Sequence, residues 1–161
     1  MLTRTTETGV QVLLYLAMRR RREPASPRAM AGALGLSASY LSKVTGQLVR
    51  AGVLVAHKGS KGGVTMARPA AEIRLLEIVE ALQGSVTGDY CRPRSPGCRT
   101  CGFHRAMREV HHATLEALSR WTLAEMASTP GRSGTASPEP GCLTAPVTRA
   151  VRLENRKGER P

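Results

Sequence analysis

The spacing of apolar positions along the chain predicts a mostly helical protein. Residues 2–18 are apolar on nearly every side of a helix, which predicts burial in a core or against a second subunit. Residues 37–50 predict a helix with one buried stripe, because their apolar side chains lie three and four positions apart. These side chains are Leu41, Val44 and Leu48. A further helix is expected at about 76–83, with Gly84 as its end.

The segment between Ser26 and Ser37 predicts a short helix followed by a tight turn. Ser26 can cap a helix with its side-chain oxygen, and Pro27 suits a first helical turn. Gly35 is expected to end this helix in a left-handed conformation, and Ser37 to cap the next one. Two helices joined in this way form a helix-turn-helix unit.

Two short apolar segments, residues 53–57 and 64–67, predict a β-hairpin. The glycines and lysines between them, from Lys58 to Gly63, predict a flexible cationic tip, which is a wing. Residues 73–75 are a candidate for one more short strand. The expected fold class is therefore mainly α with a small β-hairpin wing (α+β), a winged helix-turn-helix.

A long C-terminal dimerisation helix is expected from Gly102 to about Ala127. Its apolar positions alternate in spacing between four and three residues, which is typical of a coiled-coil seam. They are Phe103, Met107, Val110, Thr114, Ala117 and Trp121. Such a helix would be about 40 Å long at 1.5 Å per residue. On so small a domain it predicts a homodimer.

Composition divides the chain into four regions. The expected winged helix-turn-helix domain spans residues 1–84, a cysteine-bearing loop spans 85–101 and the dimerisation helix spans 102–128. Residues 129–161 are rich in Pro, Gly, Ser and Arg and lack periodicity, which predicts a disordered basic tail.

The longest apolar run is too short to cross a membrane. The arginines at 19–22 follow this run, whereas a signal peptide has its positive charges before the apolar stretch. A cytoplasmic protein without a membrane partner is therefore expected.

Basic residues dominate the charge of the chain. With 24 Lys and Arg against 12 Asp and Glu, the formal net charge is +12, which favours a polyanionic partner. Double-stranded DNA is expected, because the second helix of such a unit enters the major groove with its N-terminal residues towards the bases. The candidate contacts on that helix are Ser37, Ser39, Tyr40, Ser42 and Lys43. Those in the wing are Lys58, Gly59, Ser60, Lys61 and Gly62, and those at the start of the preceding helix are Ser26 and Arg28. A winged helix used only for protein contacts is the alternative.

A cysteine cluster precedes the long helix. Cys91, Cys98 and Cys101 are followed by His104, in the spacing C-x6-C-x2-C-x2-H. Thiolates bind soft metals and iron–sulfur clusters, and a nearby imidazole can complete four ligands. Cys101 and His104 lie three residues apart at a helix start, so both project from one face, where the helix dipole favours thiolate. Zinc suits the same donor set, and a metal-free thiol switch is a third interpretation.

No pattern in the chain predicts an enzyme. The wing glycines lie between strands and not at a strand-to-helix turn, so they do not form a nucleotide loop. Carboxylates are few, and Asp89 is the only Asp. We therefore expect no catalytic residue and no small-molecule substrate, although the sequence leaves a Cys101–His104 catalytic pair open.

As a combination, these motifs resemble the IscR/NsrR-type (Rrf-two) family of winged-helix regulators. The resemblance covers roughly the first four fifths of the chain. It is carried by Leu2-Thr3, Leu14-Tyr15-Leu16-Ala17, Ser39-Tyr40-Leu41, Gly59-Ser60-Lys61-Gly62-Gly63, Ala67-Arg68-Pro69 and Thr122-Leu123-Ala124-Glu125. It implies a dimeric transcriptional regulator, usually a repressor, on an inverted-repeat operator. It also implies control by an iron–sulfur cluster that senses redox state, nitric oxide or cluster status.

The resemblance further implies a ligand set. Cluster-binding members place three cysteines in this loop, and Cys101-x2-His104 resembles the IscR pattern in which the histidine is a ligand, which favours a 2Fe–2S cluster over a 4Fe–4S cluster. In NsrR-like relatives the fourth ligand is a carboxylate near the N-terminus of the other subunit, and Glu7 occupies that position here. The chain departs from the family in one respect, since Cys98 and Cys101 are closer together than the usual separation of five residues.

Overall fold

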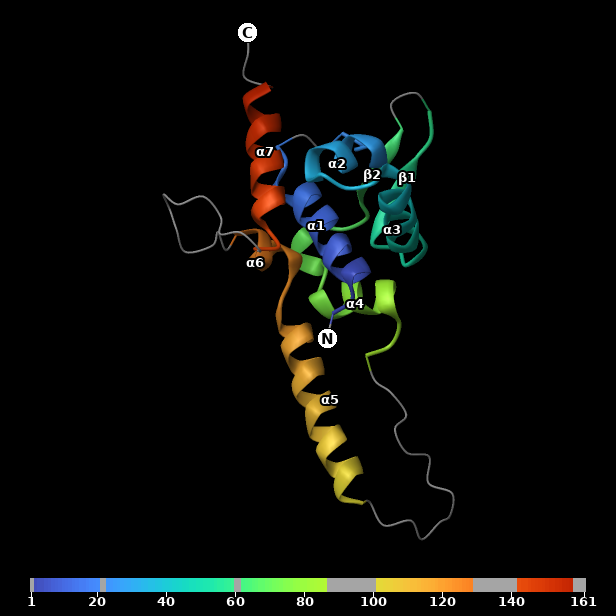
Figure 1. The fold of residues 1–161 in the computed structure, drawn as a ribbon, viewed down its shortest axis with the longest axis vertical. Helices are drawn as coiled ribbons and strands as arrows, with labels where there is room; N and C mark the ends of the chain where they lie inside the picture. Colours follow the sequence, from blue (N-terminus) through green and yellow to red (C-terminus); the bar gives the residue numbers. More distant parts are fainter. Residues whose placement is uncertain (1, 21–22, 60–61, 87–100, 129–141, 158–161) are drawn as a thin grey trace.

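A computed structural model of the chain describes residues 2–20, 23–59, 62–86, 101–128 and 142–157. Most of the described elements form a head, from which one long helix projects (Figure 1). In chain order they are α1 (Arg4–Met18), α2 (Pro27–Leu34), α3 (Ala38–Arg50), β1 (Leu54–His57), β2 (Gly63–Met66), the 3-10 turn η1 (Ala70–Glu72), α4 (Leu75–Gln83), α5 (Gly102–Arg120), α6 (Leu123–Ser128) and α7 (Ala145–Lys157). The predicted fold class is confirmed: the described part is mostly helical with a two-stranded antiparallel hairpin. No helix in these ranges is long and apolar enough to span a membrane.

Helix α1 is the centre of the head, as its apolar pattern predicts. It packs against α3, α4, α6 and α7, so nearly every side of it contacts another element. Val12 and Leu13 are fully buried, and Thr6 and Thr8 are buried as well. At Gly9 a Cβ would collide with the side chain of Leu82, so glycine is what allows α1 and α4 to approach so closely.

The helix-turn-helix unit forms where the sequence predicts it. The Ser26 side chain caps α2 by accepting a hydrogen bond from the Ala29 N–H at 3.1 Å, and Gly35 ends the helix with a left-handed φ of 70°. The predicted stripe of Leu41, Val44 and Leu48 is buried. Ser37 occupies the N-cap position of α3, but the predicted capping bond is wrong: its hydroxyl pairs instead with that of Ser39, at 3.0 Å.

The predicted hairpin is present and joins the head at its base. Leu54 pairs with Met66 and His57 with Gly63 in an antiparallel register. Val64 also bridges to Ala25, which ties the hairpin to the segment between α1 and α2. The candidate strand at 73–75 does not join this sheet. Arg74 instead forms an isolated bridge with Thr122, at the foot of the long helix.

The predicted single helix to about Ala127 is wrong at its C-terminal end. Helix α5 stops at Arg120, Trp121 is extended, and α6 begins two residues later. Thr122 and Glu125 form a capping box: Thr122 Oγ1 accepts from the Glu125 N–H at 3.2 Å, while Glu125 Oε2 accepts from the Thr122 N–H at 2.8 Å. These bonds start a new helix, and Leu123 is buried in the head.

The prediction of a disordered tail is wrong for residues 142–157. They contain α7, which lies beside α1 (Figure 1) and buries Val147, Ala150 and Val151. The three buried positions recur at helical spacing, but the segment is strongly basic, so its mean hydropathy is low. The rest of the predicted tail, residues 129–141 and 158–161, lies outside the described residues.

Candidate nucleic-acid interface and metal-binding segment

The outer face of α3 presents hydroxyl and cationic side chains. Ser39, Ser42 and Lys43 are exposed and lie on one side of the helix, opposite Leu41, Val44 and Leu48. Ser37 is exposed just before them. The Ser42 hydroxyl donates to the Ala38 carbonyl at 2.9 Å, which leaves its lone pairs for an outside donor. This surface can therefore meet both phosphates and base edges.

Tyr40 has a different environment from its exposed neighbours. It is half-buried against the core, and its hydroxyl donates to Thr5 Oγ1 at 3.3 Å. Its side chain thus ties α3 to the start of α1 and lines one side of a groove of about 490 Å³. Lys43 and Arg50 line the same groove, two helical turns apart on one side of α3. Arg50 was not among the predicted contacts, although its spacing of seven residues from Lys43 places it on the same side of the helix.

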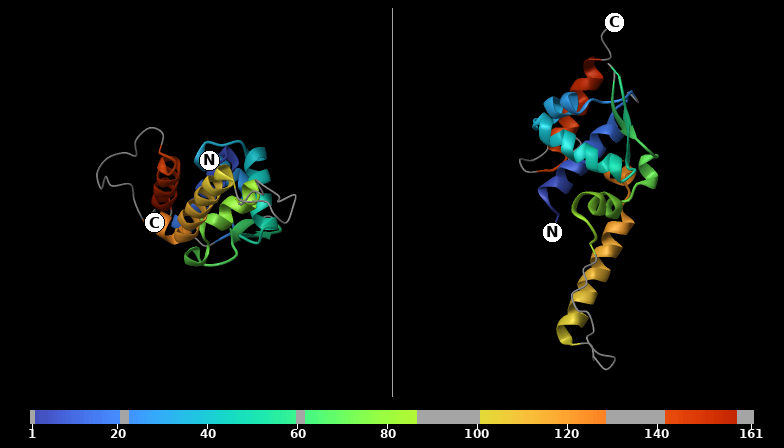
Figure 2. Two further views of the ribbon diagram at one scale, coloured as in Figure 1. Left: turned by 90° about the horizontal axis from the view of Figure 1, so that it is seen from below. Right: turned by 90° about the vertical axis from the view of Figure 1, so that its right-hand side faces the viewer.

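Strand β1 of the hairpin lies beside α3 (Figure 2, right panel). Lys58 is exposed, and Gly59 has a φ of 110° that other residues rarely adopt. Gly62 donates to the Gly59 carbonyl at 2.9 Å, and a Cβ on Gly62 would lie 2.6 Å from the His57 carbonyl oxygen. Ser60 and Lys61, the other candidate contacts of the wing, lie outside the described residues.

The start of α2 supplies a third candidate contact. Arg28 is exposed in its first turn, while the Ser26 hydroxyl is already engaged as the cap of α2. An exposed guanidinium at a helix N-terminus, next to backbone N–H groups, is suited to a phosphate. The structure therefore brings together α2, α3 and the hairpin on one head, each with an exposed cation.

Of the predicted metal ligands, the structure brings Cys101 and His104 together. Cys101 is the N-cap residue of α5, and its exposed Sγ accepts from the His104 N–H at 3.5 Å. His104 is half-buried one turn further on. Cys91 and Cys98 lie outside the described residues, and among the described ones no group of three His, Cys, Asp or Glu could hold a metal. A thiol at a helix N-terminus with an imidazole beside it fits the donor chemistry of both iron–sulfur and zinc sites.

Glu7 is not brought to these residues within one chain. It is exposed in the first turn of α1, in the head, whereas Cys101 begins α5 at the end farthest from the head (Figure 1). A role for Glu7 as a ligand would therefore require a second copy of the chain.

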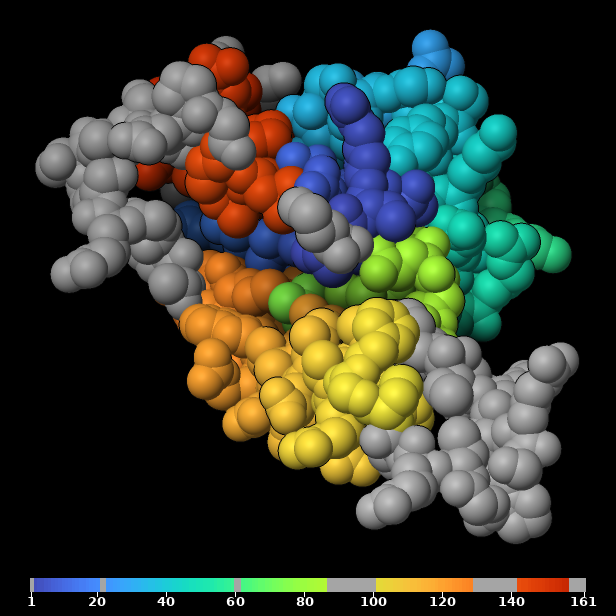
Figure 3. Space-filling model, turned by 60° about the horizontal axis from the view of Figure 1, so that its bottom comes forward, coloured from blue at the N-terminus to red at the C-terminus, as the bar shows by residue number. Residues whose placement is uncertain are grey.

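Helix α5 lies at the surface as a separate ridge (Figure 3) and contains no buried residue. On its predicted seam, Phe103 is 63% exposed and Val110 is 54% exposed, and Trp121 just beyond the helix is 40% exposed. Two seam residues, Met107 and Thr114, are half-buried, as are His104 and His111 on the adjoining side. The seam is therefore only partly covered, and Phe103 and Val110 have no covering element in the described part of the chain.

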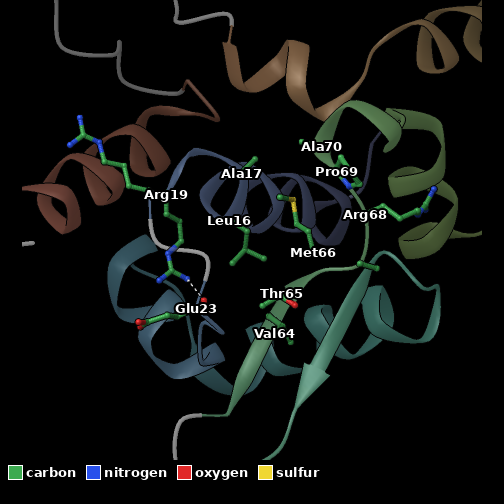
Figure 4. Close-up of a pocket in the computed structure, with 12 residues that line it drawn as sticks. Leu16, Ala17, Arg19, Glu23, Val64, Thr65, Met66, Arg68, Pro69 and Ala70 are labelled. Carbon is green, nitrogen blue, oxygen red and sulfur yellow. Dashed lines mark hydrogen bonds between the residues drawn. The ribbon is translucent and has the colours of Figure 1, made fainter.

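A cavity of about 740 Å³, which no sequence pattern predicted, lies between the end of α1 and β2 (Figure 4). Its apolar wall includes Leu16 and Met66. Two of the arginines that line it form ion pairs within the chain: Arg19 pairs with Glu154 at 3.0 Å, and Arg68 pairs with Glu77. These ion pairs reduce the positive charge that the cavity offers to an anionic ligand.

This chain is similar to a known protein family and to several proteins of known structure. A family model named Rrf2, described as an iron-dependent transcriptional regulator, matches residues 2–129. Protein aau3 of Rhizobium meliloti (strain 1021) is 31% identical over 129 residues, which are 78% of this chain and 83% of that protein. CymR of B. subtilis, the global cysteine regulator, has a TM-score of 0.67 at 21% identity, over 80% of this chain and 96% of that one. T. potens IscR has a TM-score of 0.64 at 23% identity, over 84% and 93%. The two structures share the fold, while α7 lies beyond the family match.

Proposed function

The chain belongs to the Rrf2 family of transcriptional regulators, and on that premise we propose that it is a dimeric repressor whose operator affinity depends on an iron–sulfur centre. The observation that carries DNA binding is the exposed face of α3, with Ser39, Ser42 and Lys43 beside the cationic hairpin. Members of this family are regulators and not enzymes.

The homodimer is supported by the unpaired long helix. An apolar seam along α5 with Phe103 and Val110 exposed is stable in water only if another surface covers it, and a second copy supplies a complementary seam. A two-fold axis through the paired helices would present two α3 helices to an inverted-repeat operator, about one DNA turn apart.

The iron–sulfur centre would be held at the start of α5 by Cys91, Cys98 and Cys101. His104 is the fourth ligand in one arrangement, and Glu7 of the second copy is the fourth ligand in the other. When bound, the centre supplies one-electron redox chemistry and reactivity towards nitric oxide. Cys101, the N-cap residue of α5, would supply a sulfur ligand, and His104, one turn further along the helix, would supply an imidazole nitrogen. We favour a 2Fe–2S cluster, with a 4Fe–4S cluster as the alternative.

Two other functions of the same segment compete with this one. A structural zinc ion would use the same four donors without redox activity. A metal-free thiol switch is supported by the exposure of Cys101. It is also supported by the fold shared with CymR, because one structure of CymR from Staphylococcus aureus is described as an oxidized form.

Anaerobic purification followed by a visible spectrum and iron, zinc and sulfide assays separates these three. Iron and acid-labile sulfide near stoichiometry, lost in Cys101→Ser, would support the cluster. One zinc per chain in a colourless protein would replace it with a structural metal, and absence of both would leave the thiol switch. His104→Ala compared with Glu7→Ala then identifies the fourth ligand, because only the true ligand should change the spectrum.

DNA binding is tested by selecting an operator from a random duplex library and measuring affinity by fluorescence anisotropy. Lys43→Ala should weaken the selected operator by about 10-fold, since a good base or phosphate contact contributes 1–3 kcal/mol. Glu72→Ala, an exposed change in η1 on the same head, is the control. If no sequence is enriched, or if Lys43→Ala and Glu72→Ala bind alike, α3 is not the recognition helix.

A further inference from the structure

Helix α7 is held firmly on the head although it lies outside the family match. Val147 is fully buried, and the Tyr15 hydroxyl donates to Glu154 Oε2 at 2.6 Å. Gln11 Nε2 donates to the Leu143 carbonyl at 2.9 Å just before the helix begins. These contacts come from both ends of α7, so its outer face has a fixed position on the protein.

Charge is sorted between the two sides of α7. Its one acidic residue, Glu154, faces inward, where it pairs with Arg19. Arg149, Arg152 and Arg156 are exposed, and their spacing of three and four places them on one side of the helix, which we call the arginine face. None of these three forms an ion pair with another described residue.

The arginine face has no evident structural role. The packing of α7 uses Val147, Ala150, Val151 and Glu154, all on the opposite side. Like charges three and four residues apart repel one another and weaken a helix. A polyanion bound along this side would remove that repulsion, whereas a face that serves only solubility would tolerate mixed signs.

The position of α7 joins this face to the proposed DNA surface. The helix packs against α2, whose first turn carries the exposed Arg28. Its C-terminal end and the hairpin lie at the end of the molecule away from α5 (Figure 1). Helix α3 lies on the other side of the head, so α7 cannot reach the bases that α3 faces (Figure 2).

We propose that the arginine face is an additional DNA-backbone contact, which binds phosphates flanking the stretch that α3 and the wing face. The proposal rests on the DNA-binding function proposed above. Arginine donates to phosphate oxygens without reading sequence, and the face carries no amide or aromatic side chain suited to base edges. It should therefore add affinity on any DNA long enough to reach past the operator.

The test is the triple variant Arg149→Gln, Arg152→Gln and Arg156→Gln, measured on a 60-bp duplex centred on the selected operator and on a duplex of the operator alone. On the long duplex we expect about 10-fold weaker binding and a salt dependence of log K that is less steep by up to about 3 per chain, because fewer counterions are released. On the operator alone the variant should match the wild type. The matched control, Arg4→Gln, Arg108→Gln and Arg120→Gln, removes the same charge from exposed positions on α1 and α5 and should have little effect.

Each outcome decides the proposal. If the α7 triple variant and the control triple variant bind the long duplex equally well, the proposal is wrong. It is also wrong if a variant with lysine at the same three α7 positions binds as weakly as the variant with glutamine. Binding of the wild type to anionic phosphatidylglycerol vesicles that the glutamine triple alone loses, with DNA affinity unchanged, would assign the face to a membrane surface instead. If the wild type selects no operator, the proposed function itself has failed, which is a distinct result.

Discussion

Helix α3 in the head and helix α5 have similar hydrophobic patterns, but their apolar side chains differ in exposure to solvent. In α3 the spaced residues Leu41, Val44 and Leu48 are at most 1% exposed, whereas on α5 Phe103 and Val110 are more than half exposed. Periodicity fixes which side of a helix is apolar, but it does not say whether the same chain or another chain covers that side. The apolar side of α3 is covered within one chain, whereas on α5 the exposed Phe103 and Val110 would be covered only in the dimer proposed above.

The largest expected effect is on assembly. Val110→Asp would place a charge in the seam, so we expect the dimer to dissociate while the head, whose core is buried within one chain, stays folded. Operator affinity should fall by about 100-fold, because two linked half-sites bind far more tightly than one. Sedimentation velocity and anisotropy measure both effects. His112→Asp adds the same charge on the opposite side of α5 and should remain dimeric; if both variants dissociate, the seam is not the interface.

An identical substitution in the two regions sharpens the contrast. Val44→Ala removes two methyl groups from a fully packed site and should lower the free energy of unfolding by about 2 kcal/mol. Val110→Ala should change it by less than about 0.5 kcal/mol in a protein held monomeric by dilution. Urea denaturation followed by circular dichroism measures both. Equal losses would mean that α5 is packed as tightly as the head.

The attachment of α7 gives an intermediate effect. Glu154→Gln removes the charge that pairs with Arg19, whose side chain is only 8% exposed, and should cost about 1–2 kcal/mol. Burial, together with the hydrogen bond to Glu154, raises the pKa of Tyr15 to about 12. The folded pKa lies above the ordinary value of 10.0, so the stability that this phenol contributes is complete below pH 10 and is lost between pH 10 and about 12.

An ultraviolet tyrosine titration checks this value, and Tyr15→Phe identifies the step that belongs to Tyr15. In Glu154→Gln the step should move to lower pH and still lie above 10.0, because burial remains. A Tyr15 step at pH 10.0 in the wild type would contradict the burial of this side chain against α7.

The smallest effect is expected at the junction of α5 with the head. The backbone N–H of Thr122, and then its hydroxyl, donate to Glu125 and lower the pKa of that carboxyl below its ordinary 4.5. Its contribution to stability is therefore present above that pH and is lost as the pH falls through the lowered pKa. An NMR titration of the Glu125 carboxyl measures the shift. Thr122→Ala should raise the pKa of Glu125 part of the way back, because the hydroxyl donor is lost. If the pKa of Glu125 is the same in the variant and the wild type, the capping box does not form in solution.

Much of the head could be predicted because local signals agree there. Ser26-Pro27, Gly35 and the stripe of Leu41, Val44 and Leu48 each act within a few residues, and the structure confirms their placement. The break after Arg120 was missed because the seam continues through Trp121, and its periodicity concealed the capping box of Thr122 and Glu125. Helix α7 was missed because its ordering depends on long-range bonds from Gln11, Tyr15 and Arg19.

The candidate site divides in the same way. Exposure of Ser39, Ser42 and Lys43 follows directly from the helical spacing of the buried stripe. The bond between Tyr40 and Thr5 could not be predicted, because it joins residues 35 positions apart through tertiary packing. The proximity of Cys101 and His104 followed from helix geometry. Periodicity gives no information on the other proposed ligands, because Cys91 and Cys98 lie outside the described residues and Glu7 would have to come from a second copy.

The C-terminal end of α5 is joined to the head by backbone hydrogen bonds. Leu75 donates to the Trp121 carbonyl at 2.9 Å and Leu123 donates to the Ile73 carbonyl at 2.8 Å, so the base of the helix is clamped between α4 and α6. The 19 residues of α5 extend about 28 Å beyond this clamp, at 1.5 Å per residue. A tilt of about 5° at the clamp would displace Cys101 by roughly 2.5 Å over that length. By its length alone, helix α5 relates a change of a few degrees in its angle to the head to a displacement of atomic size at Cys101.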